Sequence, residues 1–215
     1  MTRSSVSSTS GRAYAGESLS ERVARRRSQF LDAGLEVFGT TGYRTATVRQ
    51  LCRQAELTDR YFYESFASLE DLLVAVYELQ FDQLQLAVLG ALADEAALRD
   101  PMSAVEAGLD ALFTMASDPR VARVCWLEVL GVSPRVDAVY THTFERFSAL
   151  VVAFARRQFP ALEIGDAEAR VLGHALIGAV SLPVQQWLLG GYQEDKATLV
   201  AATARVYRGV IATLG

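Results

Sequence analysis

The side chains best suited to recognition chemistry lie together between Thr58 and Glu64. Their hydroxyls, carboxylates, guanidinium and phenols can form hydrogen bonds with phosphates or with the edges of bases. Positions 61 to 63 are all aromatic, and only one or two of them can turn inward at about 3.6 residues per turn. At least one tyrosine is therefore expected to contact a ligand. The face left free for that ligand is Thr58, Asp59, Arg60, Tyr61, Tyr63 and Glu64.

Two short helices are expected to hold these side chains in place. Thr47 and Gln50 form a capping-box pattern, which predicts a helix from about Val48. Residues 55–57 form a turn, and Thr58 can cap a second helix. The residues that would pack this second helix are Tyr61 or Phe62, together with Phe66. Two helices across a three-residue turn, followed by a longer helix, make a helix-turn-helix, a unit that fits one helix into the DNA major groove.

Four segments of the chain carry a wider pattern, namely RRRSQFLDAGLEVF, GYRTATVRQL, LTDRYFYESF and SLEDLL. Its landmarks, with the spacings between them, are Phe38, the pair Gly42-Tyr43, the pair Thr47-Val48, Tyr63 and Phe66. Taken together they resemble the N-terminal domain of TetR-type transcriptional repressors. The resemblance is strong over residues 22–73 and extends over the remaining chain only through length and helix layout.

The resemblance implies a ligand-responsive repressor that binds a palindromic operator in double-stranded DNA as a homodimer. Two recognition helices would then enter successive major grooves. The residues expected to contact DNA are Thr47, Arg49, Thr58, Asp59, Arg60, Tyr61, Tyr63 and Tyr43. Among them Arg60, a possible guanine partner, and Tyr61 are assigned to sequence specificity, because contacts with base edges carry the sequence information.

Three residues depart from the family pattern. The chain has Glu56 where the turn usually has Gly, Arg60 where Gly is frequent, and Leu69 where the next helix usually begins with Lys. Loss of that Lys removes a phosphate contact, so backbone anchoring is expected to shift to Tyr63, Thr47 and the arginines. The departures also keep a rival hypothesis open, in which the same fold binds another protein and does not bind DNA sequence-specifically.

Charge and composition agree with a DNA-binding segment at one end of the chain. The whole chain carries a net charge of −4, but residues 1–66 hold ten Arg against seven acidic residues, and the acidic excess lies in residues 67–215. There is no run of roughly eighteen apolar residues and no N-terminal hydrophobic signal core, so we expect no membrane segment and a cytoplasmic protein. Cys52 and Cys125 lie in apolar helical patterns and are interpreted as buried thiols, with a redox sensor as the alternative.

An enzyme is not expected. The sequence has no nucleophile with a plausible base, no glycine loop that could cradle phosphate, and no metal-ligand spacing around its two histidines. No cofactor and no metal site are therefore predicted.

The fold class predicted is all-α. Asp100-Pro101, Asp118-Pro119 and Ser133-Pro134 each place a capping side chain before a proline at the first helical position. Further helices are expected at about 68–93, 101–117, 119–130, 134–158, 166–190 and 195–213. The domains predicted are a mobile N-terminal arm (1–18), a helix-turn-helix domain (19–66) and a helical ligand-binding and dimerisation domain (67–215). Arg3 and Arg12 of the arm could extend the DNA contact, with an inert tail as the alternative.

The last two helices are apolar over more than one face, so a homodimer through both of them is expected. The small residues that would allow close helix approach are Gly173, Ala175, Gly178 and Ala179, with packing within one chain as the alternative. A pocket for a small apolar effector is expected among the central helices. Its predicted lining is Phe113, Trp126, Glu128, His142, Phe144, Phe147 and His174, although aromatic residues at helical spacing can equally be ordinary core.

Overall fold

A computed structural model describes residues 18–93, 100–160 and 163–214, and every regular element among them is helical, which confirms the all-α prediction. The helices are α1 (Leu19–Thr40), α2 (Val48–Ala55), α3 (Asp59–Ser65), α4 (Leu69–Leu92), α5 (Pro101–Ala116), α6 (Pro119–Arg123), α7 (Pro134–Gln158), α8 (Asp166–Leu189) and α9 (Lys196–Leu214), with a short 3₁₀ turn η1 (Tyr43–Thr45) and a π-helical turn η2 (Val124–Glu128). The arm predicted for residues 1–18 lies, apart from Ser18, outside the described residues.

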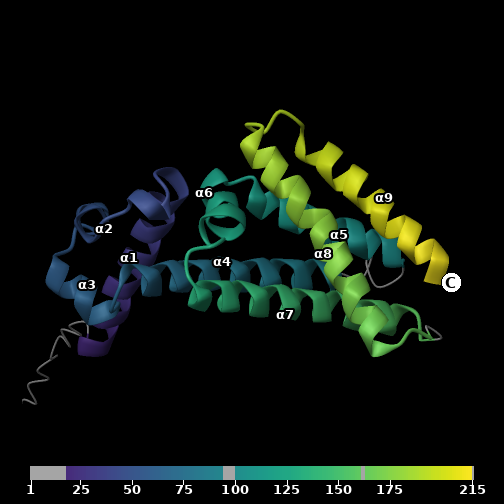
Figure 1. Cartoon of the computed structure of the whole chain (residues 1–215), viewed down its shortest axis with the longest axis horizontal. Helices are drawn as coiled ribbons and strands as arrows, with labels where there is room; N and C mark the ends of the chain where they lie inside the picture. Colours follow the sequence, from purple (N-terminus) through teal and green to yellow (C-terminus); the bar gives the residue numbers. More distant parts are fainter. Residues whose placement is uncertain (1–17, 94–99, 161–162, 215) are drawn as a thin grey trace, which may run out of the picture.

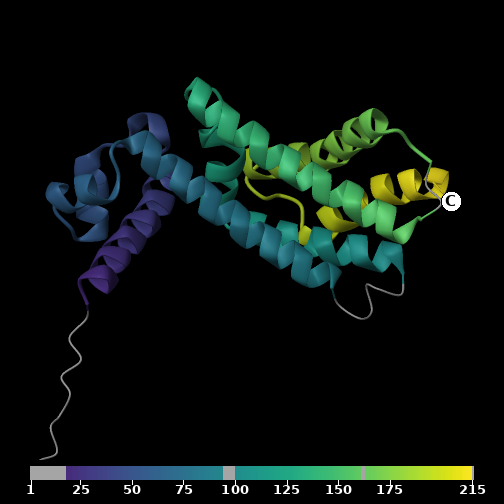
Figure 2. The ribbon, with the colours of Figure 1, turned by 90° about the horizontal axis from the view of Figure 1, so that it is seen from below.

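The molecule is elongated, with α1, α2 and α3 at one end and the C-terminus at the other (Figure 1). α4 leaves the three-helix end and runs along the length of the molecule beside α7, as the view from below also shows (Figure 2). One buried cluster joins α1–α3 to the first half of α4, and a second lies among α4, α5, α6, α8 and α9. α4 contributes side chains to both clusters, so its packing connects the two ends of the molecule.

Capping side chains start the helices where the sequence predicted. Asp100, Asp118 and Ser133 each accept a hydrogen bond from a backbone N–H of the first turn, and a proline follows each of them. The Thr47–Gln50 capping box is complete in both directions: Gln50 N–H donates to Thr47 Oγ1 at 3.2 Å, and Thr47 N–H donates to Gln50 Oε1 at 2.9 Å. These bonds satisfy backbone donors that a helix start leaves free.

The helix expected at 119–130 is wrong in one respect. α6 ends at Arg123, and the chain continues through the π-helical turn η2. A π turn carries more residues per turn than an α-helix, and here three consecutive side chains are buried: Val124, Cys125 and Trp126. Periodicity at 3.6 residues could not reveal this turn, which lies beside the three-helix end of the molecule.

Glu56 ends α2 in the left-handed conformation, with φ 55° and ψ 36°. Side chains other than Gly lose roughly 1–2 kcal/mol in this region, because Cβ crowds the following carbonyl. The Glu56→Gly variant should therefore be more stable by about 1 kcal/mol after the larger unfolded-state entropy of Gly is counted. Urea unfolding of the full chain measures the difference. Glu56→Ala is the matched control, since it removes the carboxylate but keeps the strain, and a gain for Ala equal to that for Gly would contradict the explanation.

Two helices, α4 and α8, are long and apolar enough to cross a membrane by length and composition, with mean hydropathy of 1.3 and 1.2 over their most apolar windows. Averaging over a window detects them although neither contains an unbroken apolar run. The core helix of a protein without a membrane span passes the same test. α4 is such a core helix, because it packs into both buried clusters. In α8, by contrast, only 28% of the apolar window is buried within the chain. An apolar face of α8 therefore remains uncovered.

Candidate nucleic-acid interface and internal cavities

α3 is held on α1 by a group of phenylalanines. Phe62 is fully buried, with its ring edge-on to Phe30 at 5.4 Å between centroids and tilted against Phe66 at 6.1 Å. The prediction that Phe66 and one of Tyr61 and Phe62 pack this helix is thus correct, with Phe62 as the buried residue. Because aromatic pairs of this kind favour defined angles, the packing fixes which side of α3 faces outward.

The outer face of α3 presents polar side chains that have few partners within the chain. Tyr63 is 61% exposed and Arg60 projects beside it. The Arg60 guanidinium contacts the Glu64 carboxylate through Nε at 2.9 Å, one helical turn away. An exposed pair at this spacing stabilises by only about 0.3–0.5 kcal/mol, so the guanidinium can leave it for a base or phosphate. Thr47, Arg49, Thr58 and Asp59 are also exposed.

Tyr61 and Tyr43 pack against neighbouring side chains. Tyr61 is half-buried, and the guanidinium of Arg26 stacks over its ring at 4.0 Å from the centroid. Tyr43 is half-buried with its ring against Phe38 at 5.6 Å, and burial raises the pKa of its phenol. Both rings contact side chains of the same chain. Their contact with DNA remains a prediction. Thr58 occupies the N-cap position of α3, as predicted, but its hydroxyl accepts no hydrogen bond from a backbone N–H of this helix.

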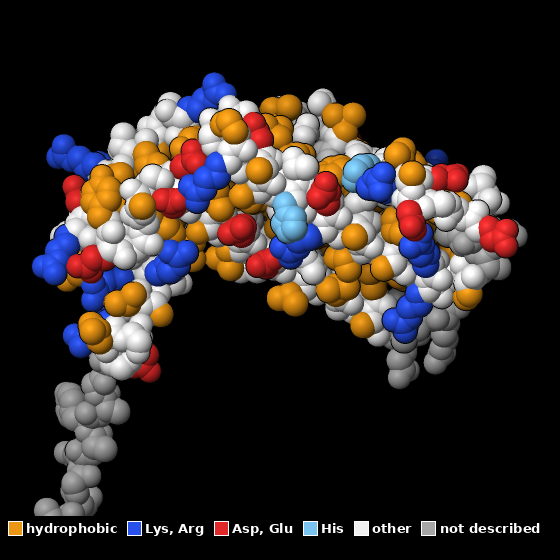
Figure 3. Space-filling model, turned by 60° about the horizontal axis from the view of Figure 1, so that its bottom comes forward, with side chains coloured by type: hydrophobic (Ala, Val, Ile, Leu, Met, Phe, Trp, Pro, Cys, Tyr) orange, Lys and Arg blue, Asp and Glu red, His pale blue; other side chains and the backbone are white. Residues whose placement is uncertain are grey.

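The start of α4 shows what replaces the missing Lys. Leu69 is half-buried against the core of the three-helix end. Ser68 caps α4 by accepting a bond from the Asp71 N–H at 3.1 Å, and Arg135 of α7 pairs with Asp71 at 2.6 Å and with Glu70 at 3.3 Å. This position therefore serves contact between helices. Arginine side chains on α1, η1, α2 and α3 lie at this end of the molecule, where Figure 3 shows several Lys or Arg side chains at the surface.

A polar junction joins the three-helix end to η2. The carboxylate of Glu128, only 12% exposed, accepts the Tyr43 backbone N–H at 2.7 Å and Arg123 Nε at 2.8 Å. Gly42 lies against it with φ 89°, and a Cβ there would be 3.1 Å from Glu128 Oε1. Bonds to an ionised acceptor with little solvent are stronger than neutral ones. Glu128, which the sequence pattern assigned to an effector, therefore connects the two ends of the molecule.

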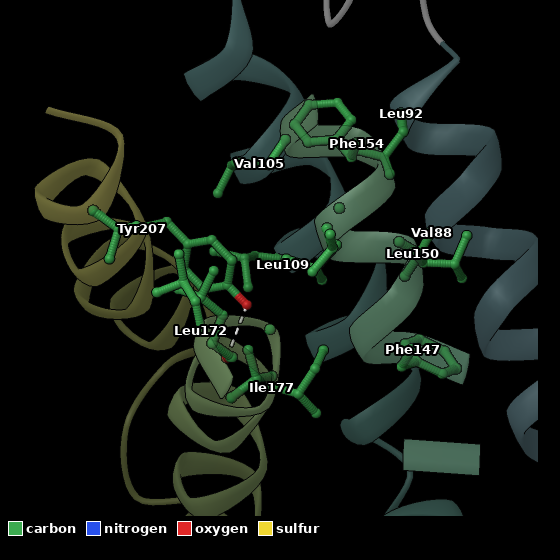
Figure 4. A pocket seen from close by; sticks show the side chains of 18 of the residues that line it. Val88, Leu92, Val105, Leu109, Phe147, Leu150, Phe154, Leu172, Ile177 and Tyr207 are labelled. Carbon is green, nitrogen blue, oxygen red and sulfur yellow. Dashed lines mark hydrogen bonds between the residues drawn. The ribbon is translucent and has the colours of Figure 1, made fainter. Parts of the chain in front are cut away.

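The larger cavity lies toward the C-terminal end and spans about 1140 Å³, a volume that includes space open to solvent. Side chains of α4, α5, α7, α8 and α9 line it, almost all of them aliphatic or phenylalanine (Figure 4). The Tyr207 hydroxyl is the polar exception, but it donates to the Leu176 carbonyl at 3.0 Å. Among the described residues, the lining thus offers hydrophobic contact without a free hydrogen-bonding side chain. A second cavity of about 420 Å³ adjoins it and is mainly aromatic.

The predicted lining residues separate into three groups. Phe147 borders both cavities, and Trp126 and Phe144 line the second. Phe113 is fully buried against Trp187 as ordinary core, and His142 is exposed. His174 packs 5.5 Å from the Phe144 ring, and its Nε2 is buried without a hydrogen-bond partner among the described residues.

Of the residues that line the larger cavity, sequence reasoning predicted only Phe147. Most of the others are ordinary aliphatic side chains, such as Val88, Leu92, Leu109 and Leu150. No residue type distinguishes them from core. The one available signal was a set of long helices with apolar residues on more sides than one chain could bury.

α8 and α9 leave apolar side chains at the surface. Val171, Leu182 and Leu189 of α8 are 65%, 58% and 64% exposed, and Val206 of α9 is 48% exposed. Of the small residues in α8, one fits packing within the chain and another fits close approach by a second helix. Gly173 packs within the chain against Ser148, while a Cβ at Gly178 would meet nothing within 4 Å.

Both cysteines are buried thiols. Burial, with a smaller effect of Asp59, raises the pKa of Cys52 to about 11, and burial raises the pKa of Cys125 as well. Each thiol is therefore protonated at neutral pH. Because the thiolate is the reactive form, the geometry favours the interpretation as small hydrophobic residues.

Known proteins with this fold are numerous among solved structures. The fatty acid degradation regulator FadR from Bacillus halodurans superposes with a TM-score of 0.72 at 18% identity, covering 84% of this chain and 93% of that one. FadR from Bacillus subtilis in complex with stearoyl-CoA gives 0.72 at 18% identity over 83% and 96%. A transcriptional regulator from Aquifex aeolicus VF5 gives 0.64 at 18% identity over 86% and 99%. No curated protein matches the sequence.

A family model gives the more specific finding. Residues 30–76, which run from the end of α1 through α2 and α3 into α4, match the model of bacterial regulatory proteins of the tetR family. The match covers the phenylalanine packing of α3 and its polar outer face. Residues 30–76 therefore carry the N-terminal domain of the tetR family of bacterial regulatory proteins, and the described chain has the all-helical fold of solved transcriptional regulators.

Proposed function

We propose that this protein is a ligand-responsive transcriptional repressor that binds a palindromic operator as a homodimer. Residues 19–66 would form the DNA-binding domain, and residues 67–215 the ligand-binding and dimerisation domain. The observation that carries the proposal is the outer face of α3, where Arg60 and Tyr63 are held outward by the buried Phe62. An outward helix with donors at its first turns is suited to the major groove.

The homodimer is supported by the uncovered face of α8. Val171, Ala175, Gly178, Leu182 and Leu189 follow one another at steps of four, three, four and seven residues, which places them on one stripe of this helix. Three of them are exposed large hydrophobic residues, and Gly178 leaves room for close approach by another helix. A second copy, packed through α8 and α9 as a four-helix bundle, would cover the stripe of both chains by one symmetric contact.

The effector class is supported by the lining of the larger cavity. A site with aliphatic walls and no free polar side chain selects a hydrophobic molecule. FadR from Bacillus subtilis, which shares the fold, was solved with stearoyl-CoA, and we propose a long unbranched hydrocarbon chain as the effector group here. Binding would shift the population between conformers that differ in the spacing of the two recognition helices, with the Glu128–Tyr43 junction as one connection between the ends.

A mobility-shift experiment with DNA from upstream of the gene itself and of its neighbours tests the proposal. The expected result is a sequence-specific shift that weakens as salt rises, because the protein displaces counterions from phosphates. The absence of any salt-sensitive, sequence-specific shift would favour the rival in which the fold binds only protein.

Two neighbouring substitutions on α3 separate base contacts from backbone contacts. Arg60→Ala should relax specificity by roughly 1–3 kcal/mol at a single base position, because a guanidinium pairs with guanine in a fixed geometry. Tyr63→Phe should weaken binding to all sequences by a similar factor, because it removes a hydroxyl available to phosphate. Titrations against operator variants with one base changed measure both effects. If both variants bind like the unchanged protein, the DNA-reading face has been assigned wrongly.

A further inference from the structure

The two cavities share one wall. Leu112, Phe147, Ile177 and Val180 line both of them. Phe147 is the largest of the four and is 7% exposed. In Figure 4, Phe147 and Ile177 lie at one end of the larger cavity, and Leu92 and Phe154 lie at the opposite end. The ring of Phe147, which can move by rotation of its side chain, therefore lies at the boundary between the two cavities.

The spaces on either side of Phe147 differ in chemistry. The larger one is aliphatic, while the second is lined by the rings of Tyr77, Phe81, Trp126, Tyr140 and Phe144. Phe81 packs against both the boundary and Trp126, because its ring centroid is 5.6 Å from that of Phe147 and 5.7 Å from that of Trp126. A group that displaces Phe147 would thus enter an aromatic space whose lining includes Trp126.

Trp126 belongs to the turn that contacts the DNA-binding end. It lies in η2, and Glu128 of the same turn accepts the Tyr43 backbone N–H at 2.7 Å. The aliphatic cavity reaches no residue of η2. Contact between a bound molecule and η2 therefore requires entry into the second cavity.

We infer that the two cavities form one effector site divided by Phe147, and that this ring sets the length of hydrocarbon chain that reaches Trp126. The inference rests on the proposed hydrophobic effector. A charged end group stays near the surface, where Leu89 is 38% exposed, because burying it without a partner is costly. The methyl end therefore points inward. Short chains fill the aliphatic cavity, and longer chains displace the ring.

Fatty acids brominated at the terminal carbon provide the test, because bromine quenches a tryptophan that it touches. The full chain has two tryptophans, and Trp187→Phe leaves Trp126 as the only one. With this variant, terminally brominated stearic acid should quench the emission, whereas terminally brominated octanoic acid should bind without quenching. Stearic acid brominated next to the carboxylate should bind without quenching as well. Stearic acid without bromine is the control for changes that binding itself causes.

Substitution of the ring tests its role directly. Each methylene group that gains burial tightens binding by about fourfold, so Phe147→Ala should strengthen long chains by about tenfold or more and shift the onset of quenching to shorter ones. Phe147→Leu, which keeps more of the packing, should give a smaller change in the same direction. Leu150→Ala is the matched control, because Leu150 lines only the aliphatic cavity and its loss should weaken all lengths similarly.

The outcomes are distinguishable. Chains that bind but never quench Trp126, with a length profile unchanged by both Phe147 variants, would overturn the division by Phe147 and leave the hydrophobic effector in place. Failure of every chain length to bind would reject the proposed effector class itself, and the inference with it. Neither result would bear on the separate proposal that α3 binds DNA.

Discussion

Leu182→Glu is expected to dissociate the homodimer and to abolish operator binding at concentrations where the unchanged protein binds fully. Leu182 is 58% exposed in the middle of the α8 stripe. Around a twofold axis the substitution would bury one unpaired carboxylate from each chain, at several kcal/mol per charge. The dimer dissociation constant should therefore rise by roughly a thousandfold or more. Sedimentation measures the mass, and a titration with operator DNA measures the binding.

Leu86→Glu is the matched control for this result. Leu86 lies on α4 and is 70% exposed, so the same change of chemistry is made at a similar surface position outside the α8 stripe. This variant should remain dimeric and bind DNA. If Leu182→Glu stayed dimeric, or if Leu86→Glu dissociated equally, the interface would lie somewhere other than the α8 stripe.

Phe62→Ala should destabilise the DNA-binding end by about 3–5 kcal/mol, which is the cost of truncating a buried phenylalanine. The ring is fully buried and contacts Phe30 and Phe66, so its loss leaves a cavity under α3. Whole domains are stable by only about 5–15 kcal/mol. The variant should therefore lose α3 packing and DNA affinity together. Urea unfolding followed by circular dichroism gives the stability.

The adjacent residue supplies the control for Phe62. Tyr63→Ala removes a 61% exposed ring whose main contact is the edge of Phe62 at 5.3 Å, so the stability loss should be about 1 kcal/mol at most. Its DNA affinity should nevertheless fall clearly. A large stability loss for Tyr63→Ala with unchanged DNA binding would contradict the assignment of inner and outer faces of α3.

Local signals along the chain predicted most of the fold. Proline after a capping Asp or Ser marked three helix starts because the physical cause, an acceptor for free N–H groups, lies within a few residues. Glu56, which stands where the resembled family usually has Gly, has a left-handed backbone that was not predicted from the sequence. The π turn η2 was not predictable, because its three buried residues respond to packing from helices distant in sequence.

In the candidate site, too, the features set by local periodicity were predictable and those set by contacts between distant residues were not. The outward position of Arg60 and Tyr63 follows from helical periodicity once Phe62 is buried. The packing of Tyr61 was not predictable, because its partner, Arg26, is remote in sequence. Glu128 was interpreted as a ligand contact because a polar residue in an apolar stretch looks like one, whereas its partner is a backbone N–H of Tyr43. Contacts between residues so distant in sequence produce no periodic pattern from which they could be predicted.

Selection of bound sequences from a randomised pool of double-stranded DNA tests the central claim most directly, because the operator does not have to be identified first. The proposal predicts enrichment of a palindrome whose half-site centres are separated by about 10 base pairs or a multiple of that spacing, since two α3 helices of one dimer must enter major grooves on the same side of the DNA. Enrichment of no sequence, or of a single half-site without its symmetric partner, would contradict it.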